Sequence, residues 1–271
     1  MSSSSAAVIG TLERSRAAGF ASGVGVGVLG GLVGLGGAEF RLPLLLGVFG
    51  FAALAAVIVN KAMSLVVVLA ALPARLAAVP LEQVADHWGT VANLLAGSLV
   101  GAWVGATWAT RMRSATLYRV LAVLLVFIAV VFAAERLGSL SALSLTEPAR
   151  LVAGVVAGFG IGVVAALMGV AGGELLIPTL VLLYGVDTKV AGSLSLLVSL
   201  PTMLVAFLRY SRDQSFSVLG QNRGFVVAMA AGSVVGSVGG GLLLGVVSEA
   251  VLVPLLVALL LFSAVKVWRH A

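Results

Sequence analysis

The chain has 271 residues, 61% of them hydrophobic and only 10% charged, and its mean hydropathy is +1.20. Soluble domains carry about 45–50% apolar and about 25% charged residues, so this composition excludes a soluble protein. The absence of cysteine excludes a disulfide framework, thiol catalysis and a thiolate metal site. The formal net charge of +6 comes from Lys and Arg scattered at the ends of apolar runs, which indicates membrane orientation and excludes a nucleic-acid-binding stripe.

Apolar segments follow one another along the chain, so we predict an all-α polytopic membrane protein. A polar segment, 1–16, precedes a first transmembrane repeat, 17–136, an external linker, 137–150, and a second transmembrane repeat, 151–271. The predicted crossings are 17–35, 40–51, 52–72, 90–110 and 117–134, then 151–171, 175–184, 190–208, 225–247 and 250–265. The polar start carries no cleavage site after an isolated apolar core, so we expect no signal peptide.

The second half repeats the first at an offset of 135 residues (172 minus 37). The matching pairs are Gly34 and Gly169, Gly37 and Gly172, Glu39 and Glu174, Pro43 and Pro178, Gly50 and Gly185, Asn60 and Ser195, Ser64 and Ser199, Gly97 and Gly232, Ser98 and Ser233, Gly101 and Gly236, and Gly105 and Gly240. A shared apolar composition explains some of these matches. It does not explain a glutamate and a proline in register with several glycines, which indicates a duplication.

Basic residues gather in four regions, 14–16, 111–119, 209–223 and 266–269, which the positive-inside rule places in the cytoplasm. An even number of crossings must then separate 16 from 111, and the short segment 40–51 supplies the fourth. Each half therefore has five crossings, the halves are inverted relative to each other, and both termini are cytoplasmic. The alternative treats 40–51 and 175–184 as re-entrant segments, which leaves four spanning helices in each half and makes the halves parallel (4+4). That arrangement would place the basic region 111–119 outside the cell.

Each short segment begins at a glycine elbow, which we expect to lie below the membrane surface because 40–51 is shorter than a full crossing. A helix start offers unpaired N–H groups and a partial positive charge, and glycine lets an oxyanion approach them. The elbow glycines are Gly36, Gly37, Gly172 and Gly173. We place Pro43 and Pro178, predicted helix-breaking residues, in the first turn. The competing interpretation is that the glycines only permit close packing, which we favour for 97–105 and 232–240.

Glu39 and Glu174 are the acids of greatest interest, since a duplicated carboxylate inside a membrane is costly unless paired or wet. Either each caps its short helix, or each titrates and couples anion movement to protons. If both acids faced an anion, at least one would have to be protonated or paired. Lys61 lies deep in an apolar segment and is a predicted site residue, as are the hydrogen-bond donors Asn60, Ser193 and Ser195, whereas Arg41 is interpreted as balancing Glu39.

The segments 34–43 (GLGGAEFRLP) and 169–178 (GVAGGELLIP), followed by 191–195 (AGSLS), resemble the paired signatures of the TauE/SafE family over essentially the whole chain. The family's three-glycine run reads Gly36-Gly37-Ala38 in one half and Ala171-Gly172-Gly173 in the other, and Asn60 and Lys61 stand where the second half has a serine. The resemblance implies a bacterial inner-membrane permease for sulfite, organosulfonates or other small sulfur anions.

We therefore expect a secondary transporter of small sulfur anions, with a passive small-anion channel as the alternative. No nucleophile and base pair or metal motif appears, so we predict neither an enzyme nor a cofactor or metal site. The expected partners are the sulfur anion, the bilayer and, if the glutamates titrate, protons. Transport direction, coupling ion and homo-oligomer formation stay open.

Overall fold

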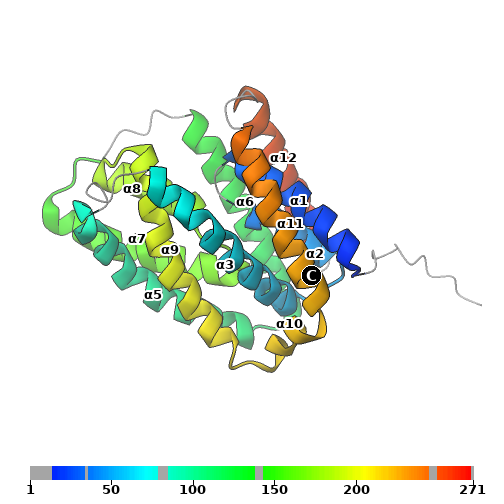
Figure 1. The fold of residues 1–271 in the computed structure, drawn as a ribbon. Helices are drawn as coiled ribbons and strands as arrows, with labels where there is room; N and C mark the ends of the chain where they lie inside the picture. The colour runs from blue at the N-terminus through cyan, green and yellow to red at the C-terminus, as the bar shows by residue number, and fades with distance from the viewer. Residues whose placement is uncertain (1–13, 34–35, 79–84, 138–142, 244–248, 270–271) are drawn as a thin grey trace, which may run out of the picture.

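The computed structural model describes residues 14–33, 36–78, 85–137, 143–243 and 249–269, and these residues form helices without any strand (Figure 1). The helices of the first half are α1 (Arg16–Val33), α2 (Ala38–Gly47), α3 (Ala53–Ala78), α5 (Trp88–Arg111) and α6 (Ser114–Leu137). Those of the second half are α7 (Glu147–Met168), α8 (Gly173–Tyr184), α9 (Thr188–Tyr210), η1 (Gln214–Ser217), α10 (Val218–Gln221), α11 (Arg223–Leu242) and α12 (Glu249–Trp268).

Six of the helices in the described part of the chain are long and apolar enough to cross a membrane: α3, α5, α6, α7, α9 and α11. Three shorter apolar helices accompany them, at Arg16–Leu32, Gly173–Tyr184 and Pro254–Trp268. Large apolar side chains such as Val152, Leu242 and Phe262 are exposed on the outside of the bundle, where lipid would cover them. The prediction of an all-α polytopic membrane protein is confirmed.

The helices of the two halves begin at corresponding positions. The starts of α8, α9, α11 and α12 follow those of α2, α3, α5 and α6 by 135 residues each (173 minus 38, 188 minus 53, 223 minus 88 and 249 minus 114). The basic region 209–223, which links α9 to α11, has helical structure of its own. The structure has η1 and α10 there, and the Asp213 side chain starts the turn by accepting a hydrogen bond from the Ser215 N–H at 2.9 Å.

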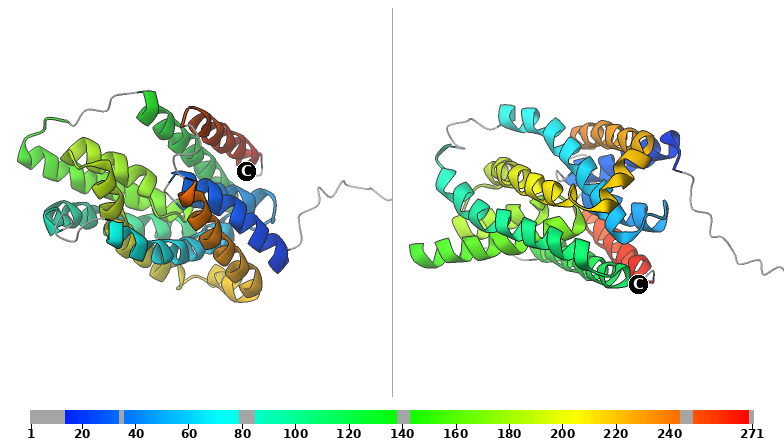
Figure 2. Two further views of the ribbon diagram at one scale, coloured as in Figure 1. Left: turned by 45° about the horizontal axis from the view of Figure 1, so that its top comes forward. Right: turned by 90° about the horizontal axis from the view of Figure 1, so that it is seen from below.

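The main contacts between a helix of the first half and a helix of the second have counterparts in which the two halves are swapped. The helix α1 packs on α11 while α7 packs on α5, and α3 contacts α11 while α9 contacts α5. In the same way α2 lies against α12 and α8 against α6, and α3 meets α9. Figures 1 and 2 show α5 beside α7 on one side of the molecule and α1 beside α11 on the other. The most extensive helix packing therefore joins one half of the chain to the other.

Glycine makes the two long seams possible. A Cβ on Gly232, Gly236 or Gly240 of α11 would collide with the backbone of Phe20, Val24 or Val28 of α1. In the other seam, Gly97, Gly101 and Gly105 of α5 meet the backbone of Val155, Phe159 and Val163 of α7. Every partner in the second seam is 135 residues from its counterpart (155 minus 20, 159 minus 24 and 163 minus 28). The predicted packing role of these glycines is confirmed.

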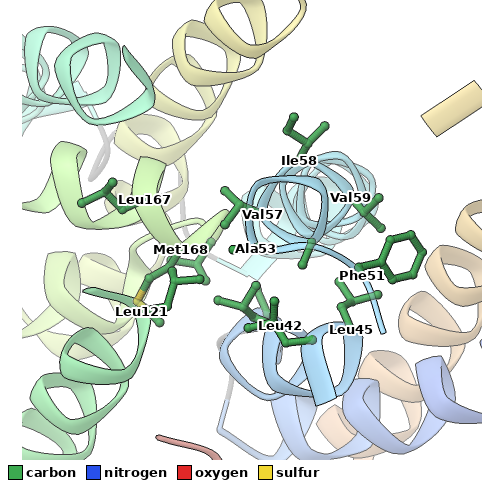
Figure 3. Close-up of a cluster of buried hydrophobic side chains, with 14 of the residues drawn as sticks. Leu42, Leu45, Phe51, Ala53, Val57, Ile58, Val59, Leu121, Leu167 and Met168 are labelled. Atoms are coloured by element: carbon green, nitrogen blue, oxygen red, sulfur yellow. The ribbon is translucent and has the colours of Figure 1, made fainter. Parts of the chain in front are cut away.

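A buried apolar core holds α2 and α3 against the second half. Leu42 of α2, Val57 of α3 and Met168 at the end of α7 belong to one cluster of buried side chains (Figure 3). The end of α7 therefore packs against helices of the first half, close to the start of α2. This contact brings the two glycine elbows into the same buried region.

Candidate functional site

Both short helices begin at a glycine with a left-handed backbone. Gly37 has φ 73° before α2, and Gly172 has φ 86° before α8. A residue with a Cβ adopts this conformation at a cost, so glycine is what allows the chain to turn sharply into each helix. Neither helix start has a side-chain cap, and its first N–H groups are a positive end without a capping partner. Gly34 and Leu35 lie outside the described residues.

The prediction that Pro43 and Pro178 occupy the first turn is wrong. Because the left-handed glycines start α2 at Ala38 and α8 at Gly173, each proline stands inside its helix, past the first turn. There the missing N–H removes the hydrogen bond to the carbonyl four residues earlier, which belongs to Glu39 or Glu174. The helices continue through the prolines, so the break in the chain is made by the glycines.

Arg41 is the centre of a buried polar cluster. The side chain is fully buried in α2, and its guanidinium donates to Asn60 Oδ1 at 2.8 Å, Ser64 Oγ at 2.8 Å and Ser233 Oγ at 3.1 Å. Asn60 and Ser64 lie on α3, whereas Ser233 lies on α11 of the second half. All three acceptors are neutral, and together they use three of the five guanidinium N–H groups. The cluster thus holds a positive charge between the halves.

Two side chains of α3 tie this cluster to the α7–α8 elbow. Asn60 Nδ2 donates to Ala38 O at 3.0 Å and to Met168 O at 3.1 Å, so it joins the start of α2 to the end of α7. Ser64 Oγ donates to Gly169 O at 3.2 Å in the elbow itself. The same two side chains also accept hydrogen bonds from Arg41. A movement of the elbow would therefore shift the acceptors of the guanidinium.

Lys61 is fully buried and reaches the same elbow. Its ammonium donates to Ala165 O at 2.8 Å and to Val170 O at 2.6 Å. A cation at the C-terminal end of a helix is favourable because the negative end of the helix dipole lies there. The predicted burial of Lys61 inside the protein is confirmed, and its described partners are carbonyls of the second half.

The two glutamates are buried without a hydrogen bond to the described part of the chain. Glu39 and Glu174 have exposed fractions of 0% and 2%, and no carboxylate oxygen of either accepts a hydrogen bond from a described residue. The capping interpretation therefore lacks the hydrogen bond that it requires. The hydroxyls of Ser193 and Ser199 are likewise buried and unpartnered, whereas Ser195 Oγ donates to Gly192 O at 2.8 Å within its own helix.

The two halves differ in charge at corresponding positions. Leu176 occupies the place of Arg41 (41 plus 135), and Leu196 occupies the place of Lys61 (61 plus 135). Ser98, the counterpart of Ser233, hydrogen-bonds to Thr202 at 2.8 Å instead of to an arginine. Both buried cations of the described core thus come from the first half, while each half contributes one acid.

The structure brings Asn60 and Lys61, both predicted from the sequence, into contact with the elbow that Gly172 and Gly173 form. It adds Arg41, Ser64 and Ser233 as the centre of the cluster, a role that sequence analysis missed for Arg41. The signal that could have found it is that Ser64 and Ser233 each belong to a serine pair of the repeat (Ser64 with Ser199, Ser98 with Ser233) and can offer acceptors to a cation at a membrane-buried position. Among the described residues, no three His, Asp or Glu side chains gather as metal ligands.

Comparisons with curated proteins and with solved structures found no match. The family model described as "Sulfite exporter TauE/SafE" matches residues 19–267, which include both elbows and every residue of the buried polar cluster. The chain thus belongs to the TauE/SafE sulfite exporter family of membrane permeases.

Proposed function

We propose that this protein is a secondary transporter that moves small sulfur anions, sulfite or organosulfonates, across the bacterial inner membrane. The observation that carries the proposal is the buried Arg41 guanidinium, which has only neutral hydrogen-bond acceptors contributed by both halves. A buried cation without a carboxylate contact attracts an anion strongly, because water does not screen it.

The proposed pathway runs between inverted repeats. The exchange of helix partners between the halves and the matching glycine seams support a pseudo-two-fold relation. The basic regions support an arrangement with five crossings in each half and with both termini in the cytoplasm. In this arrangement the two elbows approach the same central region from opposite faces of the membrane.

The proposed anion site combines the Arg41 guanidinium with the start of α2. Two guanidinium N–H groups have no described acceptor, and the first N–H groups of α2 are uncapped. A sulfite or sulfonate group offers three oxygens to such donors, as anions do at helix starts. The predicted site residues are Gly36, Gly37, Glu39, Asn60, Lys61, Gly172, Gly173, Glu174, Ser193 and Ser195, and we propose that they line the elbows around it.

Flux in proteoliposomes tests this function. Labelled sulfite, a panel of sulfonates, sulfate and thiosulfate would be offered to the wild-type protein and to Arg41→Leu, which copies Leu176 of the second half. We expect saturable flux of at least one sulfur anion, and a loss of roughly 10- to 100-fold in kcat/KM for Arg41→Leu, since charged hydrogen bonds contribute about 1.5–3 kcal/mol.

The matched control is Arg119→Leu, which removes an exposed arginine of α6 and leaves the expected flux unchanged. Flux that rises linearly with concentration and never saturates would indicate a channel instead of a carrier. No flux of any sulfur anion by folded protein would contradict the proposed substrate class.

A further inference from the structure

The two buried acids sit in different electrostatic surroundings, although duplication placed them at matching positions. Glu39 precedes Arg41 by two residues in α2, and both side chains are fully buried. The residue two places after Glu174 is Leu176, which carries no charge. A balancing cation is therefore built into the first half and missing from the corresponding position of the second.

The other buried cation does not fill this gap. The Lys61 ammonium donates to the carbonyls of Ala165 and Val170, and neither Glu174 oxygen has a hydrogen-bond partner. Ser199, the counterpart of Ser64, is also buried without a described hydrogen-bond partner, since Leu176 cannot donate to it as Arg41 donates to Ser64. An ionised carboxylate is unfavourable in such a place, whereas a neutral carboxylic acid is tolerated.

The helices that pack on α8 are α6, α7 and α9. Their charged and titratable side chains are Tyr118, Arg119, Glu135, Arg136, Glu147, Arg150, Lys189, Arg209 and Tyr210, and α8 itself adds Tyr184. Exposed side chains among these are Arg119, Glu147 and Lys189. Arg150 forms an ion pair with Glu147, and Arg209 donates to Thr107 and Thr110. The hydroxyls of Tyr118, Tyr184 and Tyr210 donate to Phe51 O, Asn93 Oδ1 and Ala166 O. The side chains of Glu135 and Arg136 are outside the described part of the structure.

The described core has four buried Glu, Lys and Arg side chains, and their net charge depends on whether Glu174 is protonated. Arg41 and Lys61 contribute two positive charges, and Glu39 and Glu174 contribute two negative charges when ionised, so the sum is zero (two minus two). Protonation of Glu174 changes the sum to one positive charge, which a monoanion would cancel. Loss of that proton restores the acid's charge and repels a bound anion.

We propose that Glu174 carries the proton that crosses the membrane with the anion, one for one and in the same direction, while Glu39, two residues from Arg41, stays ionised. This inference rests on the proposed transport function and assigns different roles to two residues that the duplication made equivalent. In both moving states, the loaded protonated one and the empty deprotonated one, the buried core is neutral. The only bond that forms and breaks is the O–H bond of the Glu174 carboxylic acid, whose proton comes from water on one side of the membrane and returns to water on the other.

The test measures how far a pH gradient concentrates the anion. Proteoliposomes with the membrane potential clamped at zero would receive the labelled monoanion that gives the largest flux in the panel, and protein-free vesicles would measure leakage. One-for-one symport predicts about a tenfold accumulation on the alkaline side for each pH unit, since one unit is a tenfold proton ratio.

Glu174→Gln is compared with Glu147→Gln, which removes an exposed acid of α7. We expect Glu174→Gln to accumulate no anion, with a final ratio of 1, while it still exchanges labelled for unlabelled anion, because its core remains one charge positive. Glu147→Gln should keep the tenfold ratio, and Glu174→Asp, which restores an acid, should regain it. Size-exclusion profiles and melting curves would establish that each variant is folded.

The inference is overturned if Glu174→Gln keeps the tenfold ratio, if Glu147→Gln loses it, or if folded Glu174→Gln exchanges no anion. These results differ from a failure of the proposed function. Saturable wild-type flux with a ratio of 1 would overturn the proton assignment alone. The absence of flux for every sulfur anion would overturn the proposed function and this inference with it.

Discussion

The glycine seam between α1 and α11 offers a sharp test of the packing. An alanine at Gly236 would place its Cβ 2.9 Å from the carbonyl carbon and the Cα of Val24, closer than real Cβ atoms approach backbone. Backbone cannot turn aside as a flexible side chain does, so the two helices must separate. Overpacking of this kind typically costs about 1–3 kcal/mol. A Cβ added at Gly239 of the same helix would have no atom of the described residues within 4 Å, which makes Gly239→Ala the matched control.

The gain in helix propensity from Gly to Ala, up to about 1 kcal/mol, is common to both variants and cancels in the comparison. We therefore expect Gly236→Ala to be less stable than Gly239→Ala by about 1–3 kcal/mol, a factor of roughly 5 to 150 in the unfolding constant. The assay is equilibrium unfolding in mixed micelles, followed by tryptophan fluorescence. Gly101→Ala should behave like Gly236→Ala, since it meets the backbone of Phe159. Equal or greater stability of Gly236→Ala than of Gly239→Ala would refute this packing.

Three further variants test the polar cluster and the elbow. Lys61→Leu, which copies Leu196, removes the hydrogen bonds to Ala165 O and Val170 O and should lower the free energy of unfolding by about 1–3 kcal/mol. The control is Lys189→Leu, at an exposed position. Equal melting temperatures of the two variants would contradict the role of Lys61. Gly172→Ala must adopt φ 86° and should cost about 1–3 kcal/mol in unfolding experiments, whereas Gly160→Ala, which points into open space, should cost nothing. Arg41→Lys keeps the charge, but an ammonium cannot reproduce the planar guanidinium's hydrogen bonds to Asn60, Ser64 and Ser233. KM should therefore rise about tenfold or more in the flux assay. An unchanged KM would contradict a role of the guanidinium in anion binding.

The sequence predicted the helices well because long apolar runs and the duplication carry strong signals. The starts of α3 and α9 lie within two residues of the positions that hydropathy indicated (53 against 52 and 188 against 190). The start of α2 at Ala38 was less visible, since it depends on the left-handed backbone of Gly37. Pro43 was consequently placed one turn too early.

The candidate site was predicted only in part. Asn60 and Lys61 stand out in the sequence because polar groups deep in an apolar segment are rare. Arg41 was assigned to Glu39 from sequence proximity, whereas its hydrogen bonds go to α3 and to Ser233 of α11, which is distant in the chain. That contact depends on how the halves pack, which a pattern within one segment does not reveal.

The proposed transport pathway requires the two halves to cross the membrane in opposite directions. The chain has no cysteine, so single cysteines can be placed at Arg113 and at Ser248, which are equivalent by duplication (113 plus 135), and probed with a membrane-impermeant thiol reagent. Inverted repeats predict that Arg113→Cys is labelled only from the cytoplasmic side and Ser248→Cys only from the external side. Labelling of both positions from the same side would contradict the inverted arrangement.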